Sequence, residues 1–290
     1  MGVDLGFNRI AGYFNEAAHK YSDDKGTVYT SATTFIHEFE KPFDRKYWSE
    51  YKAKERGVSV EVILSEWKEL NDASLVRGNG IHNALEDGIN DAYKVSGEQV
   101  SFPSGRISDA RYQEPIGVTT IIELRQIKIY NQYPLIRATL EKYIFAGYTI
   151  YAEYRLYRPE IGLSGTIDIL CVKGNDIVIL DWKTNKKPMF FESGYYKKVW
   201  KNGVKVETTN FVKTLDRMLA PLNHIPACLG MTYTLQLSLY AYMLSMYGFT
   251  IKGLVLFHIQ PINNIDYVKY HVLDYRRSDI ELMLKHTNRI

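Results

Sequence analysis

The segment LSGTIDILCVKGNDIVILDWKT, residues 163–184, decides the fold of this chain. Two runs rich in Ile, Val and Leu, 163–172 and 176–184, have the composition and length of β-strands. The sequence KGND lies between them, and its central pair, Gly174 and Asn175, is typical of a tight hairpin turn. The second run is apolar on both faces, as the central strands of a sheet are. The segment therefore predicts a buried β-hairpin at the centre of a sheet.

The charged residues of this hairpin lie toward one end of its strands. Asp181 and Lys183 are two positions apart on the second strand, so they point to the same face. Asp168 is the single charged residue of the first strand. If Gly174 and Asn175 form the turn, paired residues have numbers that sum to 349, which places Asp168 opposite Asp181.

Two opposed carboxylates repel each other, because cross-strand Cβ atoms are only about 4.5–5.5 Å apart. Hard divalent ions such as Mg²⁺ and Mn²⁺ prefer carboxylate oxygens and would relieve this repulsion. Lys183 would then stand beside the ion, where it could contact an attacking water or the developing phosphorane charge. The structural alternative is that Asp181 and Lys183 form an ordinary salt bridge and that Asp168 only solvates a strand end.

Two predicted helices carry further candidates. Gly78, His82 and Glu86 recur at a spacing of four residues, which places them on one helix face. His82 could add a neutral nitrogen ligand to a carboxylate site, although taken alone it is better explained as a surface or packing histidine. Gln236 and Tyr240 share a face in the same way. Gln236 could hold a lysine, a water or a phosphate, or be an ordinary surface amide.

Hydrophobic periodicity predicts the other elements. Helices are expected at residues 60–70, 76–93, 120–145 with an interruption at Pro134, 231–246 and 278–286, and strands at 149–157, 251–260 and 267–273. Residues 185–230 are predicted to be irregular. This order predicts an α/β (α+β) domain with a mixed central β-sheet flanked by helices and a helical N-terminal part.

Composition excludes several classes of protein. Cys171 and Cys228 are the only cysteines and cannot build a four-cysteine iron–sulfur cluster or a CxxC zinc pair, so a metal would need oxygen or imidazole ligands. No secretory signal and no apolar run of about 18 residues are visible, so we expect an intracellular, cytoplasmic protein without a membrane partner. The net charge of +3 permits a polyanionic partner without requiring one. Frequent Lys, Asn, Ile and Tyr indicate an AT-rich genome, such as that of a bacterium or phage.

The motifs form an ordered set along the chain: Gly78-x3-His82-x3-Glu86, Gly165-Thr166-Ile167-Asp168, Asp181-Trp182-Lys183-Thr184 and Gln236-x3-Tyr240. This set resembles the RecB-like exonuclease branch of the PD-(D/E)XK nuclease superfamily, which has a restriction-endonuclease-like core. The likeness covers residues 82–86 and 153–244 well, and residues 1–75 and 186–230 poorly. Gly-x-x-Asp replaces the Pro-Asp of the superfamily name, and the cysteines of the cluster-bearing members are missing, which excludes an iron–sulfur cluster.

The resemblance implies a role for each matched residue. The implied ligands of one or two Mg²⁺ or Mn²⁺ ions are His82, Asp168, Asp181 and the backbone carbonyl of Trp182. The implied catalytic residues are Lys183, which would orient the nucleophilic water, together with Asp181, Asp168, Gln236 and Tyr240. Glu153 matches an acidic position that precedes the Gly-x-x-Asp segment, and Glu86 is the other additional candidate.

We expect a single nuclease domain over residues 1–290, with a helical N-terminal elaboration (1–147), a nuclease core (148–290) and an insertion (185–230) that grips DNA. The insertion interleaves cations with aromatic residues as a single-strand stacking surface does, at Lys186, Lys187, Tyr195, Tyr196, Lys197, Lys198 and Trp200. The alternative is a solvated loop whose aromatic residues fold onto the core.

The implied function is hydrolysis of DNA phosphodiester bonds. The resemblance favours an exonuclease acting on single strands or DNA ends in recombination, repair or replication, because that branch of the superfamily works mainly on such substrates. The sequence itself shows no base-reading module. Recombination or replication proteins would be further partners. One alternative is a nuclease-derived module that binds DNA or a recombination partner without cutting. Another is a phosphohydrolase acting on a small nucleotide, although the chain has no Gly-rich phosphate loop.

Overall fold

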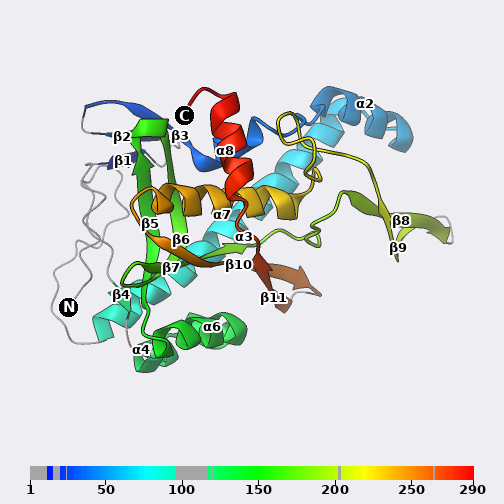
Figure 1. Ribbon diagram of the computed structural model, residues 1–290. Helices are drawn as coiled ribbons and strands as arrows, with labels where there is room; N and C mark the ends of the chain where they lie inside the picture. The colour runs from blue at the N-terminus through cyan, green and yellow to red at the C-terminus, as the bar shows by residue number, and fades with distance from the viewer. Residues whose placement is uncertain are drawn as a thin grey trace.

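The computed structural model describes residues 12–15, 20–23, 25–95, 117–118, 121–201, 204–263 and 265–290 (Figure 1). The strands in these ranges are β1 (Gly12–Asn15), β2 (Lys20–Asp23), β3 (Val28–Ser31), β4 (Gly117–Val118), β5 (Thr149–Arg158), β6 (Leu163–Lys173), β7 (Asp176–Lys183), β8 (Gly194–Lys201), β9 (Val204–Lys213), β10 (Thr250–Ile262) and β11 (Ile265–Leu273). The helices are α1 (Ala32–His37), α2 (Arg45–Arg56), α3 (Val60–Val95), α4 (Ile121–Gln126), α5 (Lys128–Gln132), α6 (Pro134–Phe145), the 3-10 turn η1 (Pro159–Ile161), α7 (Leu229–Ser245) and α8 (Arg277–His286).

A mixed sheet forms the centre of the described structure. Seven of its strands follow the order β1-β2-β3-β6-β7-β10-β11, while β5 pairs with β6 and with β4. The β3–β6 and β7–β10 pairs are parallel, and the other pairs are antiparallel. The predicted β6–β7 hairpin is confirmed: its pairs run from Lys173–Asp176 to Ile169–Leu180, and Gly174 has a φ of 56° that favours glycine.

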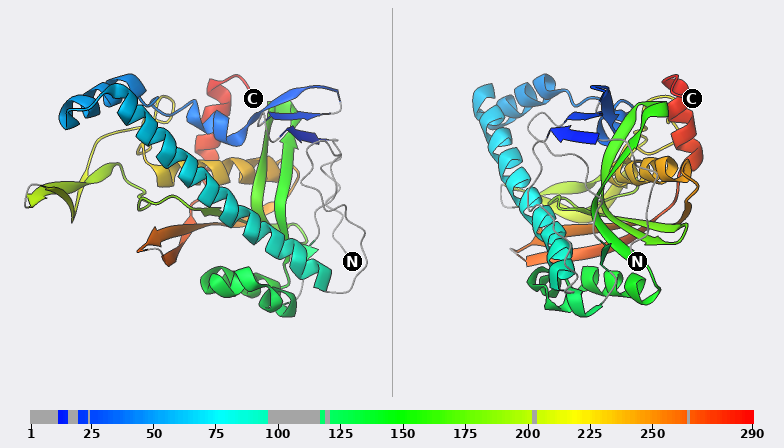
Figure 2. Two further views of the ribbon diagram at one scale, coloured as in Figure 1. Left: turned by 180° about the vertical axis from the view of Figure 1, so that it is seen from behind. Right: turned by 90° about the vertical axis from the view of Figure 1, so that its left-hand side faces the viewer.

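Helices cover both faces of this sheet. One core contains Ile177 and Ile179 of β7 with apolar residues of α1, α7 and α8. The other contains Val178, Leu180 and Trp182 of the same strand with residues of α3, α4, α5 and α6. The right-hand view of Figure 2 shows α3 and α7 on opposite sides of the strands. Both faces of β7 are thus apolar because each is buried in one of the two cores, as predicted for a central strand.

The partners of β6 leave an interval along one of its edges. Leu163 and Ser164 pair with β3, and residues 169–173 pair with β7. Among the described residues, 165–168 have no ladder partner on this edge, although β5 pairs along the other. The strands therefore part at the segment that carries the Gly-x-x-Asp motif.

Two predictions about the elements are corrected, and the predicted helical N-terminal part is confirmed but contains additional strands. The helices expected at 60–70 and 76–93 are one helix, α3, whose 36 residues run through Gly78 and Gly80. The N-terminal part is helical but also supplies β1, β2 and β3, and β3 joins the central sheet beside β6. Residues 185–230 are not irregular throughout, because β8 and β9 form a hairpin there.

The break predicted at Pro134 is confirmed, since this proline is the first residue of α6, where its missing N–H costs nothing. Residues 1–11 and 96–116 of the expected elaboration lie outside the described residues. Within the described part of the chain, no helix combines the length and the apolar character that crossing a membrane requires.

Candidate metal centre

Asp168 lies where β6 and β7 part. The last hydrogen-bonded pair of the hairpin is Ile169–Leu180, and one further step in the same register brings Asp168 opposite Asp181. The two carboxylates are buried, with exposed fractions of 9% for Asp168 and 2% for Asp181. The Trp182 N–H donates a hydrogen bond to Asp168 Oδ2 at 3.1 Å, so the carboxylate takes the place of the next ladder partner.

Glu153 lies on the other side of Asp168. The β5–β6 pairs Ala152–Ile169 and Tyr154–Ile167 flank it, so the register places Glu153 opposite Asp168. Its φ of 49° is in the left-handed region, which a non-glycine residue inside a strand rarely adopts. Such backbone strain persists only where surrounding structure maintains it, and it is concentrated at functional sites. The break in regular strand geometry thus coincides with a pair of neighbouring carboxylates.

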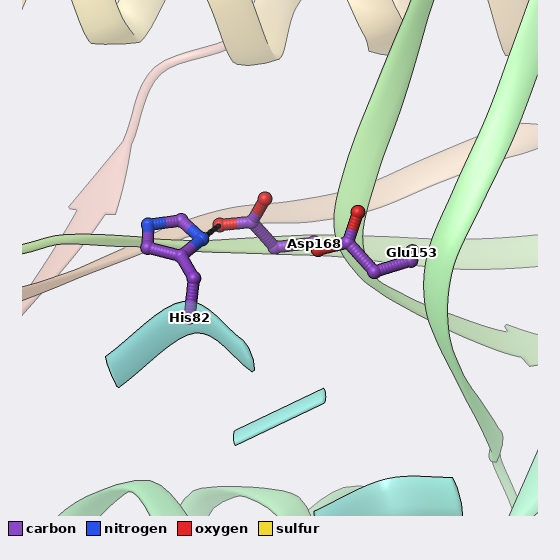
Figure 3. Close-up of side chains that lie close together, drawn as sticks. All are labelled: His82, Glu153 and Asp168. Carbon is purple, nitrogen blue, oxygen red and sulfur yellow. Dashed lines mark ion pairs between the residues drawn. The ribbon is translucent and has the colours of Figure 1, made fainter. Parts of the chain in front are cut away.

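His82 reaches the same point from α3. Its Nδ1 lies 3.7 Å from Asp168 Oδ2, and Figure 3 shows the imidazole and the Glu153 side chain approaching Asp168 from two elements. One ligand atom each from His82, Glu153 and Asp168 lie within 4.8 Å of one another. One nitrogen and two carboxylate oxygens form a donor set that suits a divalent metal ion. The sequence-based prediction that His82 meets Asp168 is therefore matched by the geometry.

Trp182 contacts both of these residues. Its indole Nε1–H donates to His82 Nδ1 at 3.1 Å, while its backbone N–H donates to Asp168. The Nδ1 atom is therefore unprotonated and already directs its single lone pair at the indole. A metal bond from this nitrogen would replace the indole hydrogen bond. The proposed role of the Trp182 carbonyl as a ligand stays a prediction.

Asp181 and Lys183 form a buried ion pair. Lys183 Nζ lies 2.6 Å from Asp181 Oδ1, and the Lys183 side chain is only 16% exposed. Burial and the neighbouring Asp168 charge raise the pKa of Asp181 to about 7, although the Lys183 charge opposes this shift. Burial would lower the pKa of Lys183, but the Asp181 and Asp168 charges outweigh burial and raise it. Lys183 is therefore an ammonium donor at neutral pH.

The centre accumulates negative charge. Burial and the charges of Asp168, Glu86 and Asp181 raise the pKa of Glu153 well above its usual range, while Arg155 acts in the opposite direction. Glu86, one turn beyond His82 on α3, is thus electrostatically part of the cluster. Ionised carboxylates this close are unfavourable without a cation, which is the physical reason to infer a metal site.

Helix α7 closes the opposite side of the centre. Gln236 Nε2 donates to the Tyr240 hydroxyl at 3.1 Å, as their shared helix face predicts. The pKa of Tyr240 is raised mainly by burial, then by Tyr21, and to a smaller extent by Asp181 and Asp168, so the phenol is close enough to sense both carboxylates. Tyr240 approaches β6 because residue 165 is glycine: a Cβ there would lie 2.4 Å from Tyr240 Cε1. The glycine of the Gly-x-x-Asp motif therefore has a packing function.

Sequence reasoning missed three residues around Lys183. Tyr233, one turn before Gln236, places its ring 5.0 Å from Lys183 Nζ in a cation–π contact. His258 Nε2 donates to the Asn185 carbonyl at 2.9 Å, and Gln260 Nε2 donates to the next carbonyl at 3.0 Å. These two side chains of β10 fix the chain as it leaves β7. The helical spacing from Tyr233 to Gln236 was visible in the sequence, whereas the role of β10 requires the parallel pairing.

The residues expected to grip DNA lie in two places: some directly follow β7, and the others are on the β8–β9 hairpin. Lys186 and Lys187 follow β7 directly, but Figure 1 shows the β8–β9 hairpin extending away from the sheet. In this hairpin Tyr195 and Trp200 are 56% and 67% exposed, and Lys197 and Lys198 are exposed beside them. The alternative of aromatic residues folded inward holds for part of the insertion. Tyr196 packs with Phe190 and Phe211, and Phe191 packs against His271.

The geometry thus unites His82, Glu153, Asp168, Asp181 and Lys183 at the parting of two strands, with Gln236 and Tyr240 adjacent. The hairpin residues Tyr195, Lys197, Lys198 and Trp200 lie on a projecting element instead. No protein-family model matches the chain and no curated protein matches it, so the resemblance stated above rests on these motifs and their arrangement.

Proposed function

We propose that the protein is a divalent-metal-dependent nuclease that hydrolyses DNA phosphodiester bonds. The observation that carries the proposal is the group of the half-buried His82 and Glu153 and the buried Asp168, whose ligand atoms lie within 4.8 Å of one another beside the Asp181–Lys183 pair. Mg²⁺ or Mn²⁺ bound there would polarise the phosphate and acidify a water molecule. The donors present fit such an ion, because they are one imidazole and several carboxylates without a thiolate.

The chain's own residues supply orientation and charge. Lys183 carries its proton at neutral pH, so it acts as a donor to an attacking water or to a phosphate oxygen rather than as a base. Asp181 positions this ammonium through the 2.6 Å contact, and the Tyr233 ring lies against its other side. Pre-positioned charge in a buried site stabilises a transition state without reorganisation, which supports hydrolysis over simple binding.

Action on single strands or DNA ends is the preferred form of this activity. The exposed Tyr195 and Trp200 rings, interleaved with Lys197 and Lys198, suit unstacked bases and phosphates better than an intact duplex. The hairpin projects from the segment that directly follows Lys183, so a strand held on it leads toward the centre. We therefore propose an exonuclease acting in recombination, repair or replication of DNA.

A non-cutting DNA-binding module is the second candidate function. Two contacts favour it: Lys183 is engaged by Asp181, and the His82 lone pair is engaged by the Trp182 indole. Both contacts could hold a site that no longer receives a metal ion.

Cleavage of end-labelled single- and double-stranded DNA in Mg²⁺, Mn²⁺ or EDTA separates the two candidates. We expect metal-dependent products, and a loss of at least about 100-fold in Asp168→Asn and Lys183→Ala, because each removes charge from the reacting centre. Asp176→Asn and Lys252→Ala are matched controls, since this exposed pair lies at the far end of β7 and β10. Undiminished turnover in Lys183→Ala would contradict the assignment, and DNA binding without cleavage in any metal would select the second candidate.

A further inference from the structure

Helix α2 presents a cluster of three exposed aromatic side chains. Tyr47, Trp48 and Tyr51 are 55%, 41% and 47% exposed. The Tyr47 and Tyr51 rings are stacked at 16° with centroids 6.3 Å apart, and Trp48 contacts both edge-on at 5.2 and 5.8 Å. Ser49 and Ala53 are the buried residues of the helix. The aromatic cluster is therefore the outward face of α2, and its exposed apolar area is a sign of an interaction site.

The same helix is basic. Its sequence, RKYWSEYKAKER, has five Arg or Lys residues against two Glu residues. Lys52 pairs with Glu55 and Arg56 with Glu66. Within the part of the chain that the structure describes, Arg45, Lys46 and Lys54 form no ion pair, and Lys46 and Lys54 are exposed. Aromatic rings thus stand among cations that have no internal counter-charge, and the partner that complements both is an anion with π-faces.

We propose that this face of α2 is a second binding surface for single-stranded nucleic acid, with unstacked bases on Tyr47, Trp48 and Tyr51 and phosphates against Lys46 and Lys54. The proposal rests on the proposed function for the identity of the substrate. Base–aromatic stacking tolerates any sequence because every base has a π-face, whereas a duplex keeps its bases covered. A single strand is therefore favoured over a duplex.

The position of α2 makes it an outer contact rather than part of the metal centre. Helix α3 begins at Val60, shortly after α2, and carries His82 in its C-terminal half. The helical rise places these two residues about 33 Å apart along the axis. Figures 1 and 2 show α2 and the β8–β9 hairpin extending from the same side of the molecule. A strand must therefore extend well beyond the metal centre to reach α2.

The test compares Tyr47→Ala/Trp48→Ala/Tyr51→Ala with the unaltered chain by fluorescence anisotropy in EDTA, where no cleavage occurs. Stacking contributes about 1–3 kcal/mol per base, so affinity for a single strand of about 20 nucleotides should fall at least tenfold. Affinity for a blunt duplex, whose bases are covered, should change less than twofold. Tyr267→Ala, which removes a 49% exposed aromatic residue from β11, is the matched control and should have no effect.

A charge variant tests the same surface without altering the rings. Lys46→Glu/Lys54→Glu should weaken binding of the long strand and flatten its dependence on salt, because fewer phosphate contacts release fewer counterions. If the aromatic variant has no thermal unfolding transition and is therefore not folded, this charge variant decides whether α2 contacts the strand. Equal affinity of both variants and the unaltered chain for the long strand overturns the proposal, as does an unaltered chain that binds no single strand.

The outcomes separate this inference from the proposed function. Metal-dependent cleavage with no effect of either α2 variant on affinity leaves the nuclease proposal intact and removes the α2 surface. Binding that depends on α2, without cleavage in any metal, supports the α2 surface and removes the nuclease proposal. A shift of tryptophan emission that is lost in Trp48→Phe, and that occurs on phosphatidylserine vesicles but not on single-stranded oligonucleotide, identifies the face as a membrane contact and overturns the nucleic-acid proposal.

Discussion

Asp181 combines burial with proximity to other charges, and this combination makes the free protein sensitive to pH. Its pKa is raised to about 7 by burial and by Asp168, against about 3.9 in an unfolded chain. The folded state therefore binds more protons than the unfolded state between about pH 4 and pH 7. Stability is greatest below pH 4 with respect to this group and falls as the pH rises through 7, by an amount on the order of 4 kcal/mol.

We predict that Asp181→Asn makes the metal-free protein more stable at pH 8, because the cost of ionising this carboxylate disappears. The free energy of unfolding in urea, measured with EDTA at a series of pH values, should also lose much of its decline between pH 4 and pH 7 in the variant. Asp176→Asn on the same strand is the control, since its 40% exposed side chain should leave the slope unchanged. An identical pH slope in Asp181→Asn and the unaltered chain would contradict the shift.

The sequence predicted some residues of the centre and not others. The register of Asp168 and Asp181 followed from strand alternation and a Gly-Asn turn, which are local features. The match of His82 to the centre came from motif order. The contact of Glu153 with Asp168 could not be derived in the same way, because a left-handed glutamate inside a strand has no local signature. Tertiary packing imposes it.

At the scale of elements, the contact between β6 and α7 depends on Gly165. An ideal Cβ at this position would lie 2.4 Å from Tyr240 Cε1 and 3.1 Å from its hydroxyl, and Tyr240 is buried and unable to move away freely. We predict that Gly165→Ala destabilises the fold by about 1–3 kcal/mol, the usual cost of overpacking. It should also reduce metal affinity, because Asp168 is three residues further along the same strand.

Thermal unfolding and Mn²⁺ titration of Gly165→Ala measure both effects. Gly80→Ala on α3 is the matched control, because a Cβ there meets nothing within 4 Å and alanine favours a helix by about 1 kcal/mol. Gly80→Ala should therefore raise the melting temperature. The double variant Gly165→Ala/Tyr240→Ala should lose part of the penalty of the glycine substitution. Additive effects of the two substitutions would show that the close approach is not the cause.

The elements that sequence analysis missed share a physical reason. Two helices were expected, at 60–70 and 76–93, but α3 continues through the polar stretch between them. Its C-terminal half is packed against the sheet, and packing overrides propensity. The β8–β9 hairpin mixes polar, aromatic and valine residues without regular alternation, and most of β8 is exposed, so its periodicity is weak. Strands β1 to β3 are four residues each, too short for a period to be recognised.

At the scale of the molecule, the centre exists because three layers meet where two strands part. His82 comes from the α3 layer, Tyr240 from the α7 layer, and the carboxylates from the sheet between them. None of the layers alone brings a nitrogen ligand and two carboxylates together. The position of α3 over the sheet therefore determines the geometry of the centre, and the contacts that fix α3 should influence metal binding from a distance.

Arg77 is the residue that fixes α3 at this point. Its guanidinium donates to the Thr184 carbonyl at 2.6 Å, at the end of β7, and to Asp266 Oδ1 at 2.5 Å on β11. Asp266 also accepts from the Tyr133 hydroxyl at 2.8 Å, and burial together with this carboxylate raises the pKa of Tyr133 to about 12. Arg77 lies on α3, five residues before His82. It thus connects α3 with β7 and β11, the two outer strands of the β7–β10–β11 region, and with the start of α6.

We predict that Arg77→Ala lowers the free energy of unfolding by about 2–4 kcal/mol, because the partly buried Asp266 loses its ion pair and the Thr184 carbonyl loses its donor. Mn²⁺ affinity should fall by about 10- to 100-fold, as for other residues that orient a ligand without touching the metal. Isothermal titration with Mn²⁺ and urea unfolding measure the two effects. Arg125→Ala is the matched control, because the 61% exposed Arg125 pairs with Glu141 away from the centre and should cost less than about 1 kcal/mol. A destabilised Arg77→Ala protein with unchanged Mn²⁺ affinity would show that His82 keeps its place without this anchor, and that the sheet alone determines the metal site.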